Sequence, residues 1–169
     1  METTQIVENQ NFAITGDYLL EHWQGHRALT RKVIEAYPED QFFIYSLAGM
    51  RPFSELIIEI IDLAEGGIEG IATGKWGSPQ DWRHTTGKTP STKAGFLKLW
   101  DEISDKINSL WPTITEERFN AVEKAFGIYD GTNYSSLLYF IDNEIHHRGQ
   151  AYVYLRSLGK TPPPFWERD

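Results

Sequence analysis

Apolar residues recur at intervals of three, four and seven residues in four long stretches of the chain, which is the spacing of one face of an α-helix. Pro38, Pro112 and Gly159 mark three of the expected helix ends, and Pro52 suits the first position of a helix. The four stretches cover approximately residues 15–37, 52–71, 91–110 and 135–158. Because most of the connections are long, the pattern predicts an all-α fold, a four-helix bundle with at least one crossover connection.

Two of the connections carry further signals. Residues 66–89 are rich in Gly, Thr and Pro. They are expected to begin as a fraying helix end and to continue as a long loop that covers a site, with His84 in solvent. Thr113 and Glu116 match a capping box and predict a short helix to about Lys124.

The last connection and the tail are less regular. Asp130 and Gly131 form a pair that is typical of a turn, and the pair fits a small hairpin and a loop equally well. After the last helix, the tail TPPPFW is stiffened by three prolines. It is expected to pack Phe165 and Trp166 back on the bundle.

Length and composition fit one folded domain spanning residues 1–169, with 40% apolar and 14% aromatic residues. The net charge of -8 argues against nucleic acid as a partner, because no basic stripe is present to neutralise phosphates. No apolar run is long enough to span a membrane, and the polar start METTQIVENQ does not resemble a signal peptide. The absence of Cys excludes thiolate chemistry of the chain itself and favours a cytoplasmic location.

The stretch SSLLYFIDNEIHHRGQAYVYLRSL, residues 135–158, carries more polar groups than a buried helix usually holds. Residues four apart on a helix lie one above the other, so Asn143 lies over His147. Phe140 and Tyr154 share that side of the helix. The Asn143–His147 pair is therefore expected to face the interior.

Other pairs on this helix remain open. Asp142 with His146 competes with the first pair if the helix is rotated. Arg148 is expected to pair with Glu144, and Gln150 to hold a neighbouring backbone group. The apolar line is expected at Leu137, Leu138, Ile141, Ile145, Tyr152 and Leu155.

Two further positions have the chemistry of metal ligands. Glu59 lies between Leu56 and Leu63 on the apolar face of the second helix, where an unpaired carboxylate is costly. It can ligate a metal, form a buried ion pair or become protonated. His22 and His26 are four residues apart, a spacing that fits either a metal site or ordinary polar contacts in the bundle.

Three segments together resemble one family over nearly the whole chain: DNEIHHRGQAYVYLRSLGKTPPPFW, EHWQGHRALTRKVIEA and MRPFSELIIEII. They are similar to the DinB-like proteins, a bacterial damage-inducible family of small helical bundles. The resemblance implies a divalent metal held by three histidines, one from the second helix and two from the last. These ligand positions fall on Glu59, Asn143 and His147, so that only one is His here. An amide oxygen is a weak ligand, and the affinity for Zn²⁺, Ni²⁺ or a similar ion is expected to be reduced.

Two functions follow from the resemblance. The first is a metal-dependent enzyme of the transferase type, in which the ion activates a low-molecular-weight thiol as the small-molecule substrate, with Glu59 and His147 as ligands. The second is a non-catalytic bundle whose metal site has decayed into a hydrogen-bond network, and which binds a small molecule or acts as a dimeric partner. Asn143 favours the second function. A homodimer is expected in either case, and no residue is assigned a catalytic role.

Overall fold

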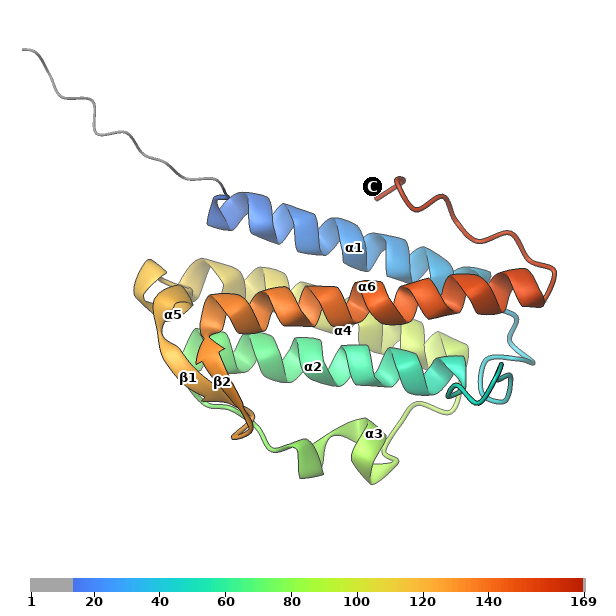
Figure 1. Cartoon of the computed structure of the whole chain (residues 1–169), viewed down its shortest axis with the longest axis horizontal. Coiled ribbons are helices and arrows are strands. Elements are labelled where there is room, and N and C mark those ends of the chain that lie inside the picture. Colours follow the sequence, from blue (N-terminus) through green and yellow to red (C-terminus); the bar gives the residue numbers. More distant parts are fainter. Residues whose placement is uncertain (1–13, 169) are drawn as a thin grey trace, which may run out of the picture.

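Four long helices form the core of the structure, a computed structural model whose described part is residues 14–168 (Figure 1). They are α1 (Gly16–Ala36), α2 (Phe53–Thr73), α4 (Lys93–Leu110) and α6 (Asn133–Ser157). Both α1 and α2 pack against α4 and α6, so α1 and α2 lie diagonally across the bundle. In Figure 1, α1 and α6 run in one direction and α2 and α4 in the other. The predicted all-α four-helix bundle is confirmed.

Short elements fill the connections. They are η1 (Pro79–Asp81), α3 (Arg83–Thr86), η2 (Trp111–Thr113), α5 (Glu116–Asn120), β1 (Val122–Ala125) and β2 (Tyr129–Thr132). Because α2 and α4 are parallel, residues 74–92 must return along the bundle, and α3 lies along the outer side of α2 (Figure 1). This segment is the predicted crossover.

Threonine is the N-cap residue of α1, α4, α5 and α6. Thr15, Thr92, Thr115 and Thr132 each accept a hydrogen bond from the backbone N–H three residues later. Such caps satisfy donors that the first turn leaves free, and they typically stabilise a helix by about 1 kcal/mol. Because Thr132 caps α6, this helix begins two residues before the predicted start.

The second helix continues through its glycines to Thr73, so the prediction that it frays near Gly66 is wrong. A Cβ atom at Gly67 would lie 2.3 Å from the Phe140 ring, and one at Gly70 would lie 2.2 Å from the Trp76 ring. These glycines therefore allow two aromatic rings to pack directly on the helix backbone. The local sequence cannot distinguish this role from that of a helix terminator.

The short helix α5 ends at Asn120, and the prediction of a helix to Lys124 is wrong. Residues 122–125 instead form β1, which pairs antiparallel with β2. The backbone N–H of Asn133 donates to the carbonyl oxygen of Ala121 at 2.9 Å, which ties the hairpin to the start of α6.

The hairpin alternative is confirmed, although its turn lies earlier than the sequence indicated. Ala125 pairs with Tyr129, so residues 126–128 form the turn, with positive φ angles at Phe126 and Gly127. Asp130 lies within β2, opposite Lys124. The Phe126 ring is buried and packs on the Phe140 and Trp82 rings, which fixes the turn against the bundle.

The interior faces of α2 and α6 follow the predictions in part. Leu56 and Leu63 of α2 are buried as expected, and so are Phe140 and Tyr154 of α6. Leu138 is 36% exposed and Ile145 37% exposed, so their placement in the core was wrong. The buried residues of α6 instead include four polar ones, Asn133, Glu144, His147 and Arg148. This mixture leaves α6 without a simple apolar stripe.

The C-terminal tail turns back toward α1 (Figure 1). The Lys32 ammonium of α1 donates to the carbonyl oxygen of Glu167 at 3.2 Å. The prediction that the aromatic rings of the tail are packed away is wrong, because Phe165 is 62% exposed and Trp166 68% exposed. None of the helices between residues 14 and 168 combines the length and the apolar character needed to cross a membrane.

Candidate functional site

Three side chains from the predicted metal-ligand positions meet between α2 and α6. The Oε1 atom of Glu59 lies 3.0 Å from the Nε2 atom of His147. The Nδ2 atom of Asn143 donates to the same carboxylate oxygen at 3.2 Å. The structure therefore brings Glu59, Asn143 and His147 together in one cluster.

The helices place these groups by simple periodicity. Asn143 and His147 lie one turn apart on α6, between the inward rings of Phe140 and Tyr154. Glu59 lies on α2 near its first turns, and its side chain is 20% exposed. The His147 side chain is 7% exposed. The cluster is thus partly buried at one edge of the bundle.

Arg51 completes the cluster, and the sequence analysis did not identify it. Its guanidinium Nη2 lies 2.6 Å from Oε2 of Glu59. Its carbonyl oxygen accepts a hydrogen bond from the Tyr154 hydroxyl at 2.7 Å, which holds the segment before α2 against α6. The one available signal was an arginine directly before Pro52, ahead of a helix with a carboxylate on its apolar face.

The charge state of Glu59 follows from these contacts. Burial acts to raise the pKa of the Glu59 carboxyl, but hydrogen bonds from His147 and Arg51 outweigh it and hold the pKa at about 2. Glu59 is therefore ionised at neutral pH. Of the three states expected for this residue, protonation is wrong and the ion pair is present.

His147 is held from both sides. Its Nδ1 atom lies 2.9 Å from the side-chain amide of Gln150, and this amide also contacts Nε2 of His146 at 3.2 Å. The Nε2 atom of His147 faces the ionised carboxylate of Glu59 and its Nδ1 atom faces Oε1 of Gln150, so each ring nitrogen lies beside an oxygen that accepts hydrogen bonds. Gln150 was expected to hold a backbone group, and this is wrong, because its side-chain amide contacts the rings of His147 and His146 instead.

These residues do not fit a tightly held divalent ion in their present arrangement. The Nε2 atom of His147 is engaged in the hydrogen bond with Glu59, and Asn143 presents its NH₂ group rather than its oxygen to the same carboxylate. Across residues 14–168, no group of three or more His, Asp or Glu side chains could hold a metal ion.

The positive charge of Arg51 also disfavours a divalent ion at Glu59. At about 4 Å and an effective dielectric of about 20, a carboxylate attracts a dication by roughly 8 kcal/mol, and a guanidinium at a similar distance repels it by as much. Arg51 thus opposes part of the attraction that Glu59 would exert on a metal.

A second polar cluster lies deeper, between α1 and α6. Glu144 is fully buried and accepts a hydrogen bond from the Thr30 hydroxyl at 2.6 Å. Its nearest guanidinium nitrogens belong to Arg148, at 3.8 Å, and Arg27, at 3.9 Å. The predicted Glu144–Arg148 pair is confirmed, but its burial and the part played by Arg27 were not expected.

The other candidates from the sequence lie apart from Glu59. His26 is buried and its Nδ1 atom contacts Nη2 of Arg148 at 2.8 Å, which is the polar contact offered as one of its two roles. Its ring packs edge-on against that of His22. Asp142 and His146 are both exposed, so the helix is not rotated toward that pair.

The crossover segment is anchored away from the Glu59 cluster. Asp62 of α2 is buried and accepts hydrogen bonds from Arg83 at 2.9 Å and from the backbone N–H of His84 at 3.0 Å. The His84 ring also contacts Asp62 at 2.9 Å, so the prediction of a solvated histidine is wrong. These contacts place α3 over the part of α2 that follows Glu59.

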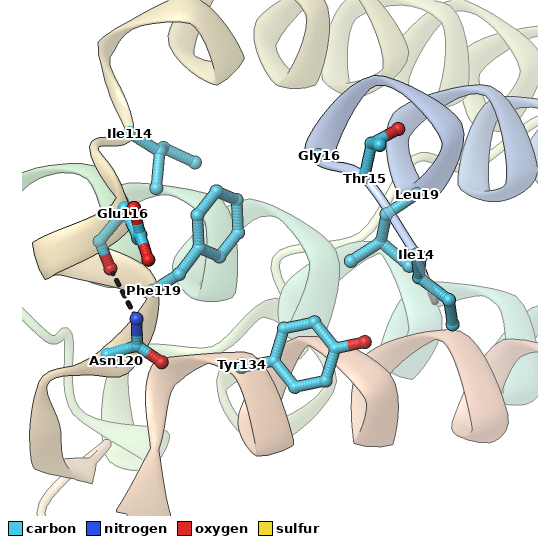
Figure 2. Close-up of a pocket in the computed structure, with 9 residues that line it drawn as sticks. All are labelled: Ile14, Thr15, Gly16, Leu19, Ile114, Glu116, Phe119, Asn120 and Tyr134. Carbon is cyan, nitrogen blue, oxygen red and sulfur yellow. Dashed lines mark hydrogen bonds between the residues drawn. The ribbon is translucent and has the colours of Figure 1, made fainter. Parts of the chain in front are cut away.

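A cavity of about 480 Å³ lies at the end of the bundle where α1 and α6 begin (Figure 2). Its walls include Leu19, Ile114 and Phe119, and the side-chain amide of Asn120 is bonded to the carbonyl oxygen of Glu116 at 3.0 Å. The cavity is mostly apolar and meets α6 at Tyr134, 13 residues before His147, so it does not belong to the Glu59 cluster.

The fold and the cluster together define an all-α four-helix bundle with a polar cluster of Glu59, Asn143 and His147 between α2 and α6. The model of the DinB family matches residues 8–169 of the chain. The protein therefore belongs to the DinB family.

Relatives agree with this assignment. The uncharacterized protein YjoA of Bacillus subtilis (strain 168) is 24% identical over 153 residues, which cover 89% of this chain and 95% of YjoA. The crystal structure of YjoA, a DinB-like protein, matches with a TM-score of 0.69 at 23% identity, over 88% of this chain and 96% of that one. A DinB-like protein from Bacillus cereus ATCC 10987 matches with a TM-score of 0.69 at 17% identity, over 88% and 95% of the two chains.

Proposed function

We propose that this protein is a metal-independent member of the DinB family that binds a small molecule without catalysing a reaction. The observation that supports the proposal is that both carboxylate oxygens of Glu59 are bonded to protein donors, Oε1 to His147 and Asn143, and Oε2 to Arg51. Arg51 supplies the positive charge that a metal would otherwise bring. The cluster then acts as a fixed link between α2 and α6.

One observation favours the second candidate, the metal-dependent enzyme acting on a low-molecular-weight thiol. Gln150 contacts Nδ1 of His147 and leaves Nε2 directed at Glu59. Metal-ligating histidines are commonly held in this way through the other ring nitrogen. In this candidate Arg51 has to move aside, and Glu59 and His147 would be the ligands.

Metal uptake distinguishes the two candidates. The protein is purified without an affinity tag, its metal content is measured, and its thermal unfolding is followed with EDTA and then with excess Zn²⁺ or Ni²⁺. We expect no bound metal and no increase in melting temperature, because an ion that binds only the folded state must raise it. A stoichiometric metal that is lost in Glu59→Ala and His147→Ala would instead support the metal-dependent enzyme.

A gain-of-function series tests the role assigned to Arg51. The double variant Glu59→His/Asn143→His restores the three imidazoles that the resemblance implies, and the triple variant adds Arg51→Gln. We expect the triple variant to bind Zn²⁺ or Ni²⁺ at least tenfold more tightly than the double variant, because the competing guanidinium is gone. Equal affinities would show that Arg51 does not oppose a metal.

Other expectations form part of this proposal. The small molecule is the partner, nucleic acid and membranes are not, and the protein acts in the cytoplasm as a homodimer. A low-molecular-weight thiol is the substrate only in the metal-dependent alternative.

A further inference from the structure

A groove runs between α1, α6 and the C-terminal tail, and we call it the tail groove. It encloses about 420 Å³ beside His22 and His26 of α1, and it continues into a hollow of about 480 Å³ along residues 161–166. The contact of Lys32 with the carbonyl oxygen of Glu167 holds the tail that forms one wall. Volumes of this size are typical of small-molecule sites.

Positive charge collects at one end of the tail groove. Arg148 lines it from α6 and Arg168 lines it from the tail. Arg148 uses three of its five N–H groups on the carbonyl oxygen and Nδ1 of His26 and on the Thr30 hydroxyl. Burial lowers the pKa of Arg148, and the like charge of Arg168 lowers it further. Both guanidinium groups line the same groove, so their like charges repel each other.

Within residues 14–168, the carboxylates nearest to this charge lie outside the groove. Glu144 lies 3.8 Å from Arg148 on its interior side. Glu21 lines a neighbouring hollow beside Arg168. In the described part of the chain, no Asp or Glu side chain is among the residues that line the tail groove itself. An anion in the groove would relieve the repulsion between the two arginines.

His26 adds a neutral donor at the same end. Burial, followed by the charges of Arg148 and Arg168, lowers the pKa of His26 to about 3, so its ring is neutral at physiological pH. Its Nδ1 atom accepts from Arg148, and the proton of the ring is therefore on Nε2. This N–H group can donate to an anion without carrying charge.

The other end of the groove is mostly apolar, although Arg156 also lines the hollow along the tail. Ile145, Tyr152 and Phe165 line it, and Phe165 is 62% exposed. The Tyr152 hydroxyl is buried and has no hydrogen-bond partner within residues 14–168. A Cβ atom at Gly149 would meet no atom of the described chain within 4 Å, so this helix position leaves open space between the two ends.

We propose that the tail groove binds a small organic anion, a carboxylate or a phosphate monoester attached to an aryl group. The anionic group would lie between Arg148, Arg168 and the Nε2–H of His26, and the ring against Ile145, Tyr152 and Phe165. A chain with a net charge of -8 repels anions over most of its surface, which makes a locally cationic groove selective. The ligand-binding part of the proposed function rests on this groove, whereas its metal-independence does not.

Isothermal titration of the full chain tests the proposal with four probes: benzoate, phenyl phosphate, inorganic phosphate and benzyl alcohol. We expect benzoate or phenyl phosphate to bind at least tenfold more tightly than inorganic phosphate and benzyl alcohol, since only the aryl anions use both ends of the groove. Comparison of the two aryl anions shows which acid group is preferred. Affinity should fall as salt is added, because the anion is partly exposed to screening.

Variants locate the binding site. Arg168→Gln should weaken aryl-anion binding at least tenfold, and Gly149→Leu should abolish it by filling the open space. Gly149→Ala is a milder substitution that should weaken binding while raising the melting temperature. Lys98→Gln is the control, because it removes a cation from the exposed surface of α4, and it should leave binding unchanged.

Failure of both aryl anions to bind at millimolar concentration would overturn the proposal. Equal binding of inorganic phosphate would overturn its aryl part, and binding that survives both Arg168→Gln and Gly149→Leu would overturn its location. None of these results bears on whether Glu59 holds a metal, which the metal-content measurement decides independently.

Discussion

At the scale of single residues, Glu144 is the most unusual group in the described chain. It is fully buried, and its Oε2 atom lacks a hydrogen-bond partner among residues 14–168, as do Nη1 of Arg27 and Nε1 of Trp23. Burial raises the pKa of Glu144 against the opposing charge of Arg27, and burial lowers the pKa of Arg27 to about 10. For both residues, the cost of removing the charge from water thus outweighs the attraction between the two charges. The pair therefore contributes little to the net free energy of folding, and its main role is to specify how α1 packs against α6.

Removing one charge of this pair should be costly. Glu144→Gln keeps an acceptor for Thr30 but leaves two buried guanidiniums without a counterion, so we expect the free energy of unfolding to fall by about 3 kcal/mol. Adding Arg27→Met should cost less than the sum of the two single changes, with a coupling of about 1–3 kcal/mol. Urea denaturation of the four proteins measures this cycle. Glu102→Gln, in an exposed pair with Lys98, should change stability by less than about 0.5 kcal/mol. Additive effects in the cycle would contradict the pairing.

The sequence predicts correctly those side-chain positions that follow from helix periodicity. Asn143, His147 and Glu59 were expected to face the interior from two helices, and they meet there. Arg51 was missed because it approaches from a loop, whose path depends on tertiary contacts such as the hydrogen bond from the Tyr154 hydroxyl. Helix periodicity carries no information about such a path.

At the scale of elements, glycines have two opposite roles on the long helices. Gly67 of α2 lies under the Phe140 ring, whereas Gly149 of α6 borders the open tail groove. The sequence shows only a glycine within a helical pattern in both cases. The sequence does not distinguish the hairpin from a loop for a similar reason. Phe126 stabilises the turn of the hairpin by packing against aromatic rings of other elements.

Matched substitutions separate these two roles. Gly67→Ala gains about 1 kcal/mol of helix propensity but forces the buried Phe140 ring to move, which typically costs 1–3 kcal/mol. We expect a lower melting temperature for Gly67→Ala. Gly149→Ala gains the propensity without a clash and should raise the melting temperature. Shifts in the same direction for both variants would contradict the packing described for α2.

A cluster around Arg118 joins several elements. Its guanidinium bonds both oxygens of Glu123 of β1, at 2.6 and 3.0 Å, and the carbonyl oxygens of Ile71 and Gly70 at the end of α2. Trp76 Nε1 also donates to Glu123, at 2.8 Å. The hydrogen bond from Arg118 is the main cause that lowers the pKa of Glu123 to about 2. The pair fastens the hairpin to the end of α2.

The Arg118–Glu123 pair should make stability depend on pH. Because the pKa of Glu123 is about 2 in the folded state and about 4.5 in the unfolded state, its contribution is fully present above about pH 4.5 and is lost as pH falls toward 2. We expect Glu123→Gln to lower the free energy of unfolding by roughly 2 kcal/mol at pH 6, allowing for solvent screening. The difference from the unmodified protein should shrink by pH 3. Urea unfolding at both pH values measures it, and a constant difference would refute the assignment.

At the scale of the whole molecule, α6 presents apolar side chains outward as well as inward. Tyr139 and Val153 are each 50% exposed, and their separation of two heptads places them on the same side of the helix. Such residues on an exposed helix are consistent with association of two chains. The fold class was predictable at this scale because four long periodic segments leave few arrangements, whereas helix periodicity alone does not predict which surface would associate with a second chain.

The expected homodimer can be tested through this surface. Sedimentation equilibrium should give twice the mass of one chain, and Val153→Glu should shift the equilibrium to monomer because it places a charge in the contact. Val122→Glu is the control, since Val122 is 76% exposed on β1. A monomer at all concentrations, or a dimer unaffected by Val153→Glu, would show that this face of α6 does not associate.

The pairing of α1 with α6 has a consequence for biosynthesis. The Thr30–Glu144 hydrogen bond joins residues separated by 114 positions, and Arg148 reaches His26 across 122. While the ribosome is still producing the middle of the chain, α1 has emerged without the helix that neutralises and covers its polar interior side. Closure of the bundle must therefore await the final helix, and ribosome-bound nascent chains that end before it should leave α1 accessible to proteases and chaperones.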